Sequence, residues 1–375
     1  MVQRLHLGYL CTGTSDAMES MLLAGRYIYY EYLRELNRRS PVSRQPLPPP
    51  LCQIQTPLVV HQWSMQLSQH PDRDFCQYLI GGITGGFRIG FHYGTNICQA
   101  AKNNMLSTRE NPAVVEQYLK KECELGRVMG PLKVGSIPLH INRFGVIPKP
   151  HQPGKWRLIV DLSHPPGASV NDGIEPELCS LSYASVDDAV AIITRLGRGT
   201  KLAKLDLESA YRIVPVHPDN RHLLGMEWQG EWYVDTALPF GLRSAPKIFN
   251  ALADGLMWIM GHNGIEWAIH YLNDYLFLGD PSFQQCDNAL RLALSLCEIL
   301  GVPVSREKVE GPATILTFLG ILLDTMAMEL WLPQVKLERL KATIAKWRHK
   351  RNCTKRELLS LIGQLQHACK VVRHG

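Results

Sequence analysis

The chain has 375 residues, a formal net charge of +6 at pH 7, and a composition that is 45% hydrophobic and 20% charged. These values exclude a disordered chain and a small disulfide-held scaffold, and they predict a globular protein of two or three domains or lobes with a sizeable core. None of the ten cysteines forms a CxxC pair, so we expect no zinc site from local spacing and a reducing, intracellular setting.

Residues 1–57 predict a helical extension followed by a linker. Residues 14–38 begin with capping-type residues and lead to the pair Arg38-Arg39, which indicates a helix. Residues 40–57 hold six prolines and indicate an extended linker. The uncharged run from Gln45 to Pro71 is rich in proline and glutamine, so we predict no membrane span and no membrane partner.

Residues 58–137 predict a helical lead-in. Residues 74–91 (DFCQYLIGGITGGFRIGF) indicate a helix that runs into a glycine-rich turn. Residues 111–128 indicate a second helix, because apolar residues recur there at helical spacing.

From residue 138 to residue 332 the pattern alternates short strands, turns and helices. Two hairpins are predicted around the turn signals His151-Gln152-Pro153-Gly154 and Gln229-Gly230. Further strands are predicted at 201–207, 211–216, on both arms of 270–279, and within 314–324, and helices at 244–260 and 284–300. An antiparallel sheet backed by helices is an α+β architecture.

Residues 333–375 predict two helices with a basic surface. The second begins at the capping box formed by Thr354 and Glu357, and its periodicity places Leu358, Ile362 and Leu365 on an inner face. The segment from position 336 to position 356 contains one acidic residue, Glu338, and nine lysines or arginines. The nine are residues 336, 339, 341, 346, 348, 350, 351, 355 and 356. This block predicts a polyanion partner, with a solvated helix face as the alternative.

Two stretches place a carboxylate at the end of an apolar strand: LAKLDLESAY with Asp206 and HYLNDYLFLG with Asp274. Mg²⁺ takes hard oxygen ligands, usually one or two carboxylates together with substrate phosphates, and two such ions can hold the attacking and leaving oxygens of a phosphoryl transfer. Adjacent strands can bring two carboxylates within about 5 Å of each other. An alternative stays open, because Asp206 also suits an ordinary strand end and Asn273-Asp274 an ordinary turn.

Six segments occur in a fixed order: GKWRLIVDLS, KLDLESAYRIVPVHP, TALPFGLRSAPKIFN, HYLNDYLFLG, GVPVSREKVEG and TFLGILLD. In this order they resemble the fingers and palm motifs of reverse transcriptases from retrotransposons of the LTR type or the DIRS-like type, over residues 110–375. The resemblance implies the polymerase right hand, with fingers and an antiparallel palm over residues 138–332 and helical thumb or connection over 333–375. It also implies an RNA-directed DNA polymerase that joins dNTPs to a primer 3′-OH on an RNA or DNA template, in a cytoplasmic particle or the nucleus.

The resemblance implies a role for each matching residue. Asp206, the Leu207 carbonyl and Asp274 would hold Mg²⁺, or Mn²⁺ in its place, and Tyr211 would pack under the incoming sugar and exclude a 2′-OH. Contacts to the nucleotide would come from Lys155, Arg157, Phe240, Gly241 and Lys308. Contacts to template–primer phosphates would come from Lys336, Arg339, Lys341, Lys346, Arg348 and Lys350. Without the resemblance, Tyr211 suits a core tyrosine and these cations suit ordinary surface charges.

The turn departs from the family pattern Tyr-x-Asp-Asp, because it reads Tyr271-Leu272-Asn273-Asp274. Asn273 keeps an oxygen at this position but loses a unit charge, so polymerisation is predicted to be impaired. The alternatives are an inactive retroelement relic that only binds nucleic acid and an unrelated α+β protein with an Asn-Asp hairpin. The sequence shows no acidic set for RNase H, no aspartic protease motif and no zinc-knuckle spacing. We therefore expect a polymerase region without RNase H, taken from a larger polyprotein or a decayed element, and the sequence indicates no oligomeric state.

Overall fold

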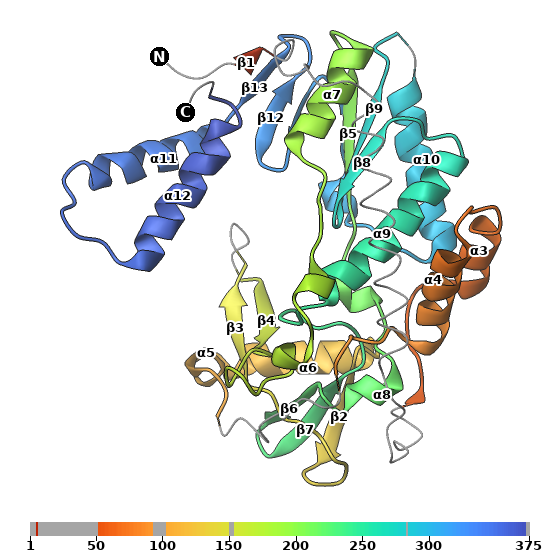
Figure 1. Cartoon of the computed structure of the whole chain (residues 1–375), viewed down its shortest axis with the longest axis vertical. Coiled ribbons are helices and arrows are strands. Elements are labelled where there is room, and N and C mark those ends of the chain that lie inside the picture. Colours follow the sequence, from red (N-terminus) through yellow and green to blue (C-terminus); the bar gives the residue numbers. More distant parts are fainter. Residues whose placement is uncertain (1–4, 7–51, 93–102, 150–153, 283, 373–375) are drawn as a thin grey trace.

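The computed structural model of the chain describes residues 5–6, 52–92, 103–149, 154–282 and 284–372. The helix predicted over residues 14–38 and most of the proline-rich linker lie outside the described residues. Figure 1 shows one part built on a central sheet, a second part below it with smaller sheets, and a helix pair that projects to one side.

The central sheet has four antiparallel strands in the order β10-β5-β9-β8. Its strands are Glu310–Ala313 (β10), Lys201–Asp206 (β5), Asp274–Gly279 (β9) and Ala268–Tyr271 (β8). The strands predicted at 201–207 and within HYLNDYLFLG are thereby confirmed, and β5 and β9 are direct neighbours.

Both faces of the two central strands, β5 and β9, are largely buried. Successive side chains of a strand point to opposite faces, and those of β5 and β9 enter two different cores. Leu205 and Phe277 pack in one core with the helices α9 (Ala245–His262) and α10 (Gln285–Leu300). Leu202 and Leu276 pack in the other with α7 (Val186–Leu196), a helix that the sequence pattern did not predict. Burial on both sides explains why these strands read as nearly continuous apolar runs.

A second sheet covers the α7 side in the order β1-β13-β12-β11. Its strands are Leu5–His6 (β1), Glu329–Trp331 (β13), Ile321–Asp324 (β12) and Ile315–Phe318 (β11). The hairpin β11–β12 confirms the strands predicted within 314–324.

The lower part of Figure 1 holds the sheet β2-β7-β6 and the hairpin β3–β4. The elements are α5 (Leu106–Glu110), α6 (Pro112–Glu124), β2 (Val128–Lys133), β3 (Phe144–Pro148), β4 (Trp156–Val160), β6 (Gly225–Trp228) and β7 (Glu231–Asp235). Both predicted hairpins are present. Gln229 and Gly230 have φ of 53° and 78°, as a two-residue turn between right-twisted strands requires.

The helices α3 (Val60–Gln66) and α4 (Arg73–Gly85) pack beside α10 and α9, and the Trp63 indole donates to the Leu300 carbonyl oxygen at 3.0 Å. Short helical turns connect the larger elements: η2 (Asn171–Gly173), η3 (Glu177–Cys179), η4 (Ala210–Ile213), α8 (Pro218–Arg221) and η5 (Arg306–Lys308). Among the described residues, no helix is long and apolar enough to cross a membrane.

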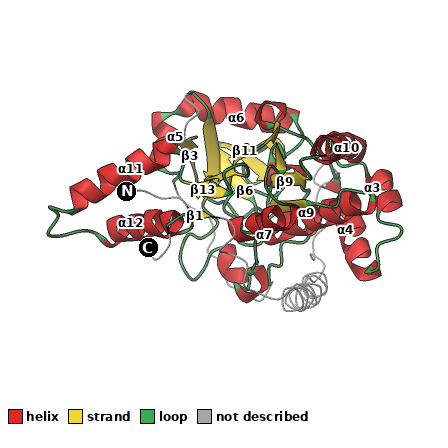
Figure 2. Ribbon diagram, turned by 90° about the horizontal axis from the view of Figure 1, so that it is seen from above, coloured by secondary structure: helices red, strands yellow, loops and turns green. Residues whose placement is uncertain are grey.

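The helices α11 (Gln334–Trp347) and α12 (Lys355–Cys369) project from the rest of the molecule, as Figure 2 shows from above. The predicted capping box at Thr354 and Glu357 is present. The inner face predicted for α12 is wrong, because Leu358, Ile362 and Leu365 are 42%, 40% and 38% exposed. A projecting helix pair has too few neighbours to cover an apolar stripe, so helical periodicity alone did not reveal burial.

The strand predicted at 211–216 is also wrong. Its first half lies in the 3₁₀ turn η4, which the chain enters through Ser209 and Ala210 at φ of 64° and 31°. Only its end is extended, where Pro215 bridges Ala237. The alternation of polar and apolar residues failed here because Arg212 is a buried charge that pairs with Glu122 and Asp235.

Candidate active site

The two predicted carboxylates are brought face to face by neighbouring strands. Asp206 ends β5, Asp274 begins β9, and the two are register partners. Tyr271 pairs with Asp274 across a two-residue turn of Leu272 and Asn273, and Leu272 takes φ of 52°. The backbone N–H of Leu207 donates to the Asn273 carbonyl oxygen at 2.9 Å, which ties the turn to the end of β5.

Both carboxylate oxygens of Asp206 accept from a neighbouring side chain. The Lys308 Nζ lies 2.8 Å from Oδ1, and the Asn273 Nδ2 donates to Oδ2 at 3.0 Å. Lys308 reaches the site from the turn η5, where the Ser305 N–H donates to the Asp206 carbonyl oxygen. Lys308 therefore neutralises the Asp206 carboxylate, and the Asn273 amide donates a hydrogen bond to it.

The pKa of the Asp274 carboxyl group is raised in the folded protein. Burial raises its pKa to about 6, with further contributions from the hydrogen bond and charge of Asp206, while Lys308 and Lys204 lower it. Two close carboxylates that share one site disfavour double ionisation. The pair therefore gains from any added positive charge.

The oxygen donors fit a hard divalent cation held by two carboxylates. Mg²⁺ commonly uses one or two carboxylates and completes its shell with water and phosphate oxygens. Among the described residues, no group of three or more His, Cys, Asp or Glu is placed to hold a metal ion. In such a cation site, Asp206 and Asp274 would supply the negative charge. Asn273 would add no carboxylate to it.

Three of the residues expected around the nucleotide lie close to one another: Tyr211, Phe240 and Arg157. The rings of Tyr211 and Phe240 are 5.3 Å apart, and the Arg157 guanidinium lies 5.0 Å from the centre of the Phe240 ring. Burial raises the pKa of Tyr211 to about 12, so its hydroxyl stays protonated. Gly241 has φ of 111°, and a Cβ there would lie 2.1 Å from the Val160 carbonyl oxygen, so only glycine fits.

Lys155 and Leu207 differ in accessibility. Lys155 is exposed near the tip of the β3–β4 hairpin, one residue before β4. Leu207 is 2% exposed, and its backbone bridges Val304. The Lys155 ammonium group therefore lies at the surface. The Leu207 carbonyl, which is expected to be a metal ligand, lies in a fixed backbone position.

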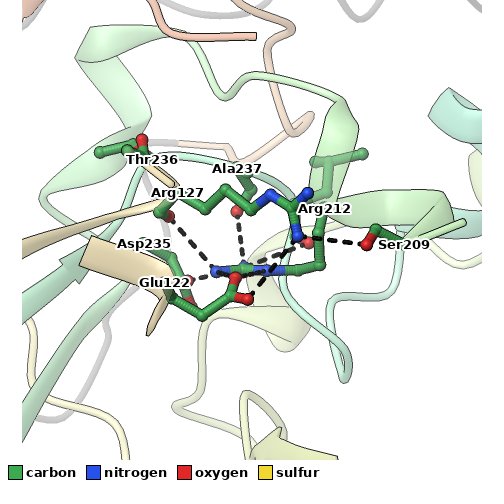
Figure 3. A network of polar contacts seen from close by, with 9 residues as sticks. Glu122, Arg127, Ser209, Arg212, Asp235, Thr236 and Ala237 are labelled. Carbon is green, nitrogen blue, oxygen red and sulfur yellow. Dashed lines mark hydrogen bonds and ion pairs between the residues drawn. The ribbon is translucent and has the colours of Figure 1, made fainter. Parts of the chain in front are cut away.

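Three groups of residues near this site were not predicted. The ring of Tyr183 lies 4.9 Å from that of Tyr271. The His270 Nε2 lies 3.0 Å from Asp254 Oδ1, behind the turn. Ion pairs join Glu122, Arg127, Arg212 and Asp235 into a buried cluster, which Figure 3 shows. The sequence gives one signal of the buried cluster, which is the charge of Arg212 between apolar residues. No local sequence pattern indicates a role for Tyr183 or Asp254.

The six basic residues predicted to contact template–primer phosphates divide into two sets. Lys341 pairs with Glu338 at 2.9 Å, Lys350 pairs with Glu357 at 2.6 Å, and Lys336 donates to the Gly320 carbonyl oxygen at 3.2 Å. The exposed side chains of the second set make no ion pair within the part of the chain that the structure describes: Arg339, Lys346 and Arg348. The second set is the more available to an external polyanion.

Comparison with known proteins shows which family and which solved structures this chain resembles. Residues 147–323 match the family described as reverse transcriptase (RNA-dependent DNA polymerase). The Pro-Pol polyprotein of simian foamy virus type 1 is 29% identical over 47% of this chain and 14% of its own length. The Pol polyprotein from transposon 412 of Drosophila melanogaster is 26% identical over 47% of this chain and 13% of its own length.

Two solved structures share the fold. The foamy viral protease-reverse transcriptase in complex with double-stranded DNA has a TM-score of 0.57 and 18% identity, over 87% of this chain and 54% of that one. The foamy viral enzyme in complex with an RNA/DNA hybrid has a TM-score of 0.57 and 18% identity, over 86% of this chain and 41% of that one.

Residues 147–323 therefore form a reverse transcriptase domain of the retroelement type, and the α+β fold is the polymerase right hand. Its palm is the sheet that carries Asp206 and Asp274. The chain spans only 14% of the length of the foamy virus polyprotein that it matches. The boundaries at residues 57, 137 and 332 and the choice between LTR-type and DIRS-like elements stay predictions.

Proposed function

We propose that the chain is an RNA-directed DNA polymerase that adds dNTPs to a primer 3′-OH on an RNA or DNA template. The observation that carries the proposal is the register pairing of Asp206 with Asp274, inside a segment that matches reverse transcriptases. An in-line attack on the α-phosphate needs positioning and charge stabilisation rather than a covalent intermediate.

Each residue of the site has a part in this proposal. Mg²⁺ or Mn²⁺, when bound by Asp206, Asp274 and the Leu207 carbonyl, supplies the positive charge that stabilises the transferring phosphoryl group. Arg157 and Lys155 hold the triphosphate, with the arginine suited to bidentate phosphate contact.

The remaining contacts place the sugar and the leaving group. Tyr211 and Phe240 form the wall under the sugar, and Gly241 lets the backbone approach it. Lys308 is 44% exposed, so it can move from Asp206 to an oxygen of the leaving pyrophosphate.

The helix pair α11–α12 completes the proposal as the part that follows the duplex. The exposed cations of α11 and its following loop suit phosphate contacts, which give affinity without sequence preference. The solved relatives with the same fold are described in complex with double-stranded DNA and with an RNA/DNA hybrid.

A second function, binding of nucleic acid without polymerisation, is favoured by one observation. The Asn273 Nδ2 donates to Asp206 where the family has a second carboxylate, so the site holds one negative charge fewer. We infer that polymerisation by this chain is slow for that reason.

Primer extension on poly(rA)/oligo(dT) in Mg²⁺ and in Mn²⁺ separates the two functions. Extension by the wild-type chain that is lost in Asp206→Asn supports the polymerase. Tight template–primer binding with no extension in either cation supports the binding protein. Failure of the folded chain to bind template–primer would contradict both.

A further inference from the structure

A buried charge cluster adjoins the proposed nucleotide pocket along the chain, because Arg212 directly follows Tyr211. Figure 3 shows the contacts of this cluster. The Arg212 side chain is 4% exposed, its Nη1 lies 2.7 Å from Asp235 Oδ1, and its Nη2 lies 2.9 Å from Glu122 Oε2. Glu122 lies in the last turn of α6, and Asp235 ends β7. Arg212 therefore joins three elements that are far apart in sequence.

The same guanidinium holds both walls of the pocket. Arg212 directly follows Tyr211 in the chain, which fixes the first wall. Its Nη1 also donates to the carbonyl oxygens of Ala237 at 3.3 Å and Leu238 at 3.4 Å, in the segment that leads to Phe240. The 5.3 Å contact between the Tyr211 and Phe240 rings thus spans two segments that meet on one side chain.

The cluster also supports a strained turn. Ser209 and Ala210, just before Tyr211, have φ of 64° and 31°, a region that L-residues rarely occupy. The Arg127 Nη1 donates to Ser209 Oγ at 3.2 Å, and the Arg212 Nη2 donates to the Arg127 carbonyl oxygen at 3.3 Å. Strain of this kind persists only where surrounding contacts hold it, and it is common at functional sites.

Stability alone does not explain four buried or half-buried charges. A buried ion cluster costs desolvation free energy, and apolar residues of similar volume often serve stability as well or better. Burial lowers the pKa of Arg212, but Asp235, Tyr118 and Glu122 raise it above the ordinary arginine value, so the guanidinium stays charged. What the charged cluster adds is a fixed direction for each of its hydrogen bonds.

We propose that Arg212, oriented by Glu122 and Asp235, is a positioning residue that sets the distance between Tyr211 and Phe240 and so determines how strongly the site prefers dNTPs over rNTPs. This inference rests on the proposed polymerase function. The Arg212 side chain is only 4% exposed, so it acts on selection through the two aromatic rings.

The test compares nucleotide binding without requiring turnover. Wild-type protein is bound to an RNA template and a dideoxy-terminated primer with G as the next template base, in Mn²⁺. Competitor template–primer is then added, and the fraction of the complex that remains is measured over a range of dCTP concentrations and of CTP concentrations. Arg212→Lys keeps the charge but loses the forked contacts, and Glu122→Gln keeps the shape with one charge fewer.

Arg88→Lys is the matched control. The Arg88 Nη2 lies 3.0 Å from Asp219 Oδ2, and this ion pair lies away from Tyr211. We expect wild type and Arg88→Lys to prefer dCTP at least about tenfold. Arg212→Lys should reduce the preference by about tenfold, mainly through tighter CTP binding, since small displacements in a site have effects of this size. Glu122→Gln should change it in the same direction with less loss of fold, as checked by thermal unfolding.

The outcomes separate the two claims. Unchanged preference in folded Arg212→Lys and Glu122→Gln overturns the positioning role and leaves the polymerase intact. Equal binding of dCTP and CTP by wild type overturns the role of the pocket in selection. No nucleotide-dependent stabilisation of the wild-type complex at all contradicts the proposed function, and the inference falls with it.

Discussion

Restoring the missing carboxylate should change activity and stability in opposite directions. In Asn273→Asp, the amide that donates to Asp206 at 3.0 Å becomes a second negative charge beside it. Without a divalent cation this repulsion destabilises the fold, because Lys308 alone neutralises the site. With a cation bound, the added charge strengthens the site that the reaction requires.

The magnitude follows from the distances. Two unit charges about 4 Å apart interact by ~4 kcal/mol at an effective dielectric of about 20. If half of this reaches the transition state, about 2 kcal/mol remains, and each ~1.4 kcal/mol is a factor of ten in rate. We expect Asn273→Asp to extend a primer between about 30 and 1,000 times faster than wild type in Mg²⁺.

Single-turnover extension of oligo(dT) on poly(rA) measures this rate directly, with enzyme in excess over template–primer. Urea unfolding in EDTA gives the stability change. Asn263→Asp, at a side chain that contacts Gln66 and the Ile259 carbonyl oxygen, controls for adding a charge. Equal rates for wild type and Asn273→Asp would refute the reasoning. Equal inactivity of both would place the defect outside Asn273.

Three further predictions follow from the same contacts. Burial raises the pKa of Asp274 to about 6, above its unfolded value, so the folded state binds more protons between about pH 4 and pH 6 and loses stability as the pH rises through this window. Asp274→Asn should therefore gain urea resistance relative to wild type between pH 4.5 and pH 7 without divalent cations, and a pH-independent difference would count against the pKa assignment. Lys346→Ala should reduce the salt slope of template–primer binding by about one unit, and Lys341→Ala by less because Glu338 already pairs with it; salt-independent affinity would contradict the duplex assignment. Gly241→Ala should cost at least about 2 kcal/mol of unfolding free energy, whereas Gly230→Ala, at positive φ with open space, should cost about 1 kcal/mol, and similar losses would disprove the close approach to Val160.

The palm could be predicted from the sequence because its signals are local. Apolar runs ending in Asp206 and Asp274 predict two strand ends, and the order of motifs predicts that they meet. Their register pairing is a property of the sheet, and no spacing along the chain determines it. The contact of Lys308 with Asp206 depends on the same long-range arrangement.

The failures share a physical cause. The segment 211–216 alternates like a strand, yet Arg212 is drawn into the protein by partners from α6 and β7, and the backbone turns to allow it. The leucines of α12 repeat like a core face, yet Leu358 and Leu365 remain 42% and 38% exposed. Local periodicity reports which side chains could be buried together, and tertiary contacts decide which are.

The central claim is that nucleotide transfer takes place at the Asp206–Asp274 pair. Its most direct test is incorporation of one labelled dNMP opposite an RNA template in the Asn273→Asp protein, with and without the added change Asp206→Asn, while template–primer affinity is measured in parallel. The account predicts that Asp206→Asn abolishes incorporation and leaves affinity within about twofold. Incorporation that persists without the Asp206 carboxylate would contradict it.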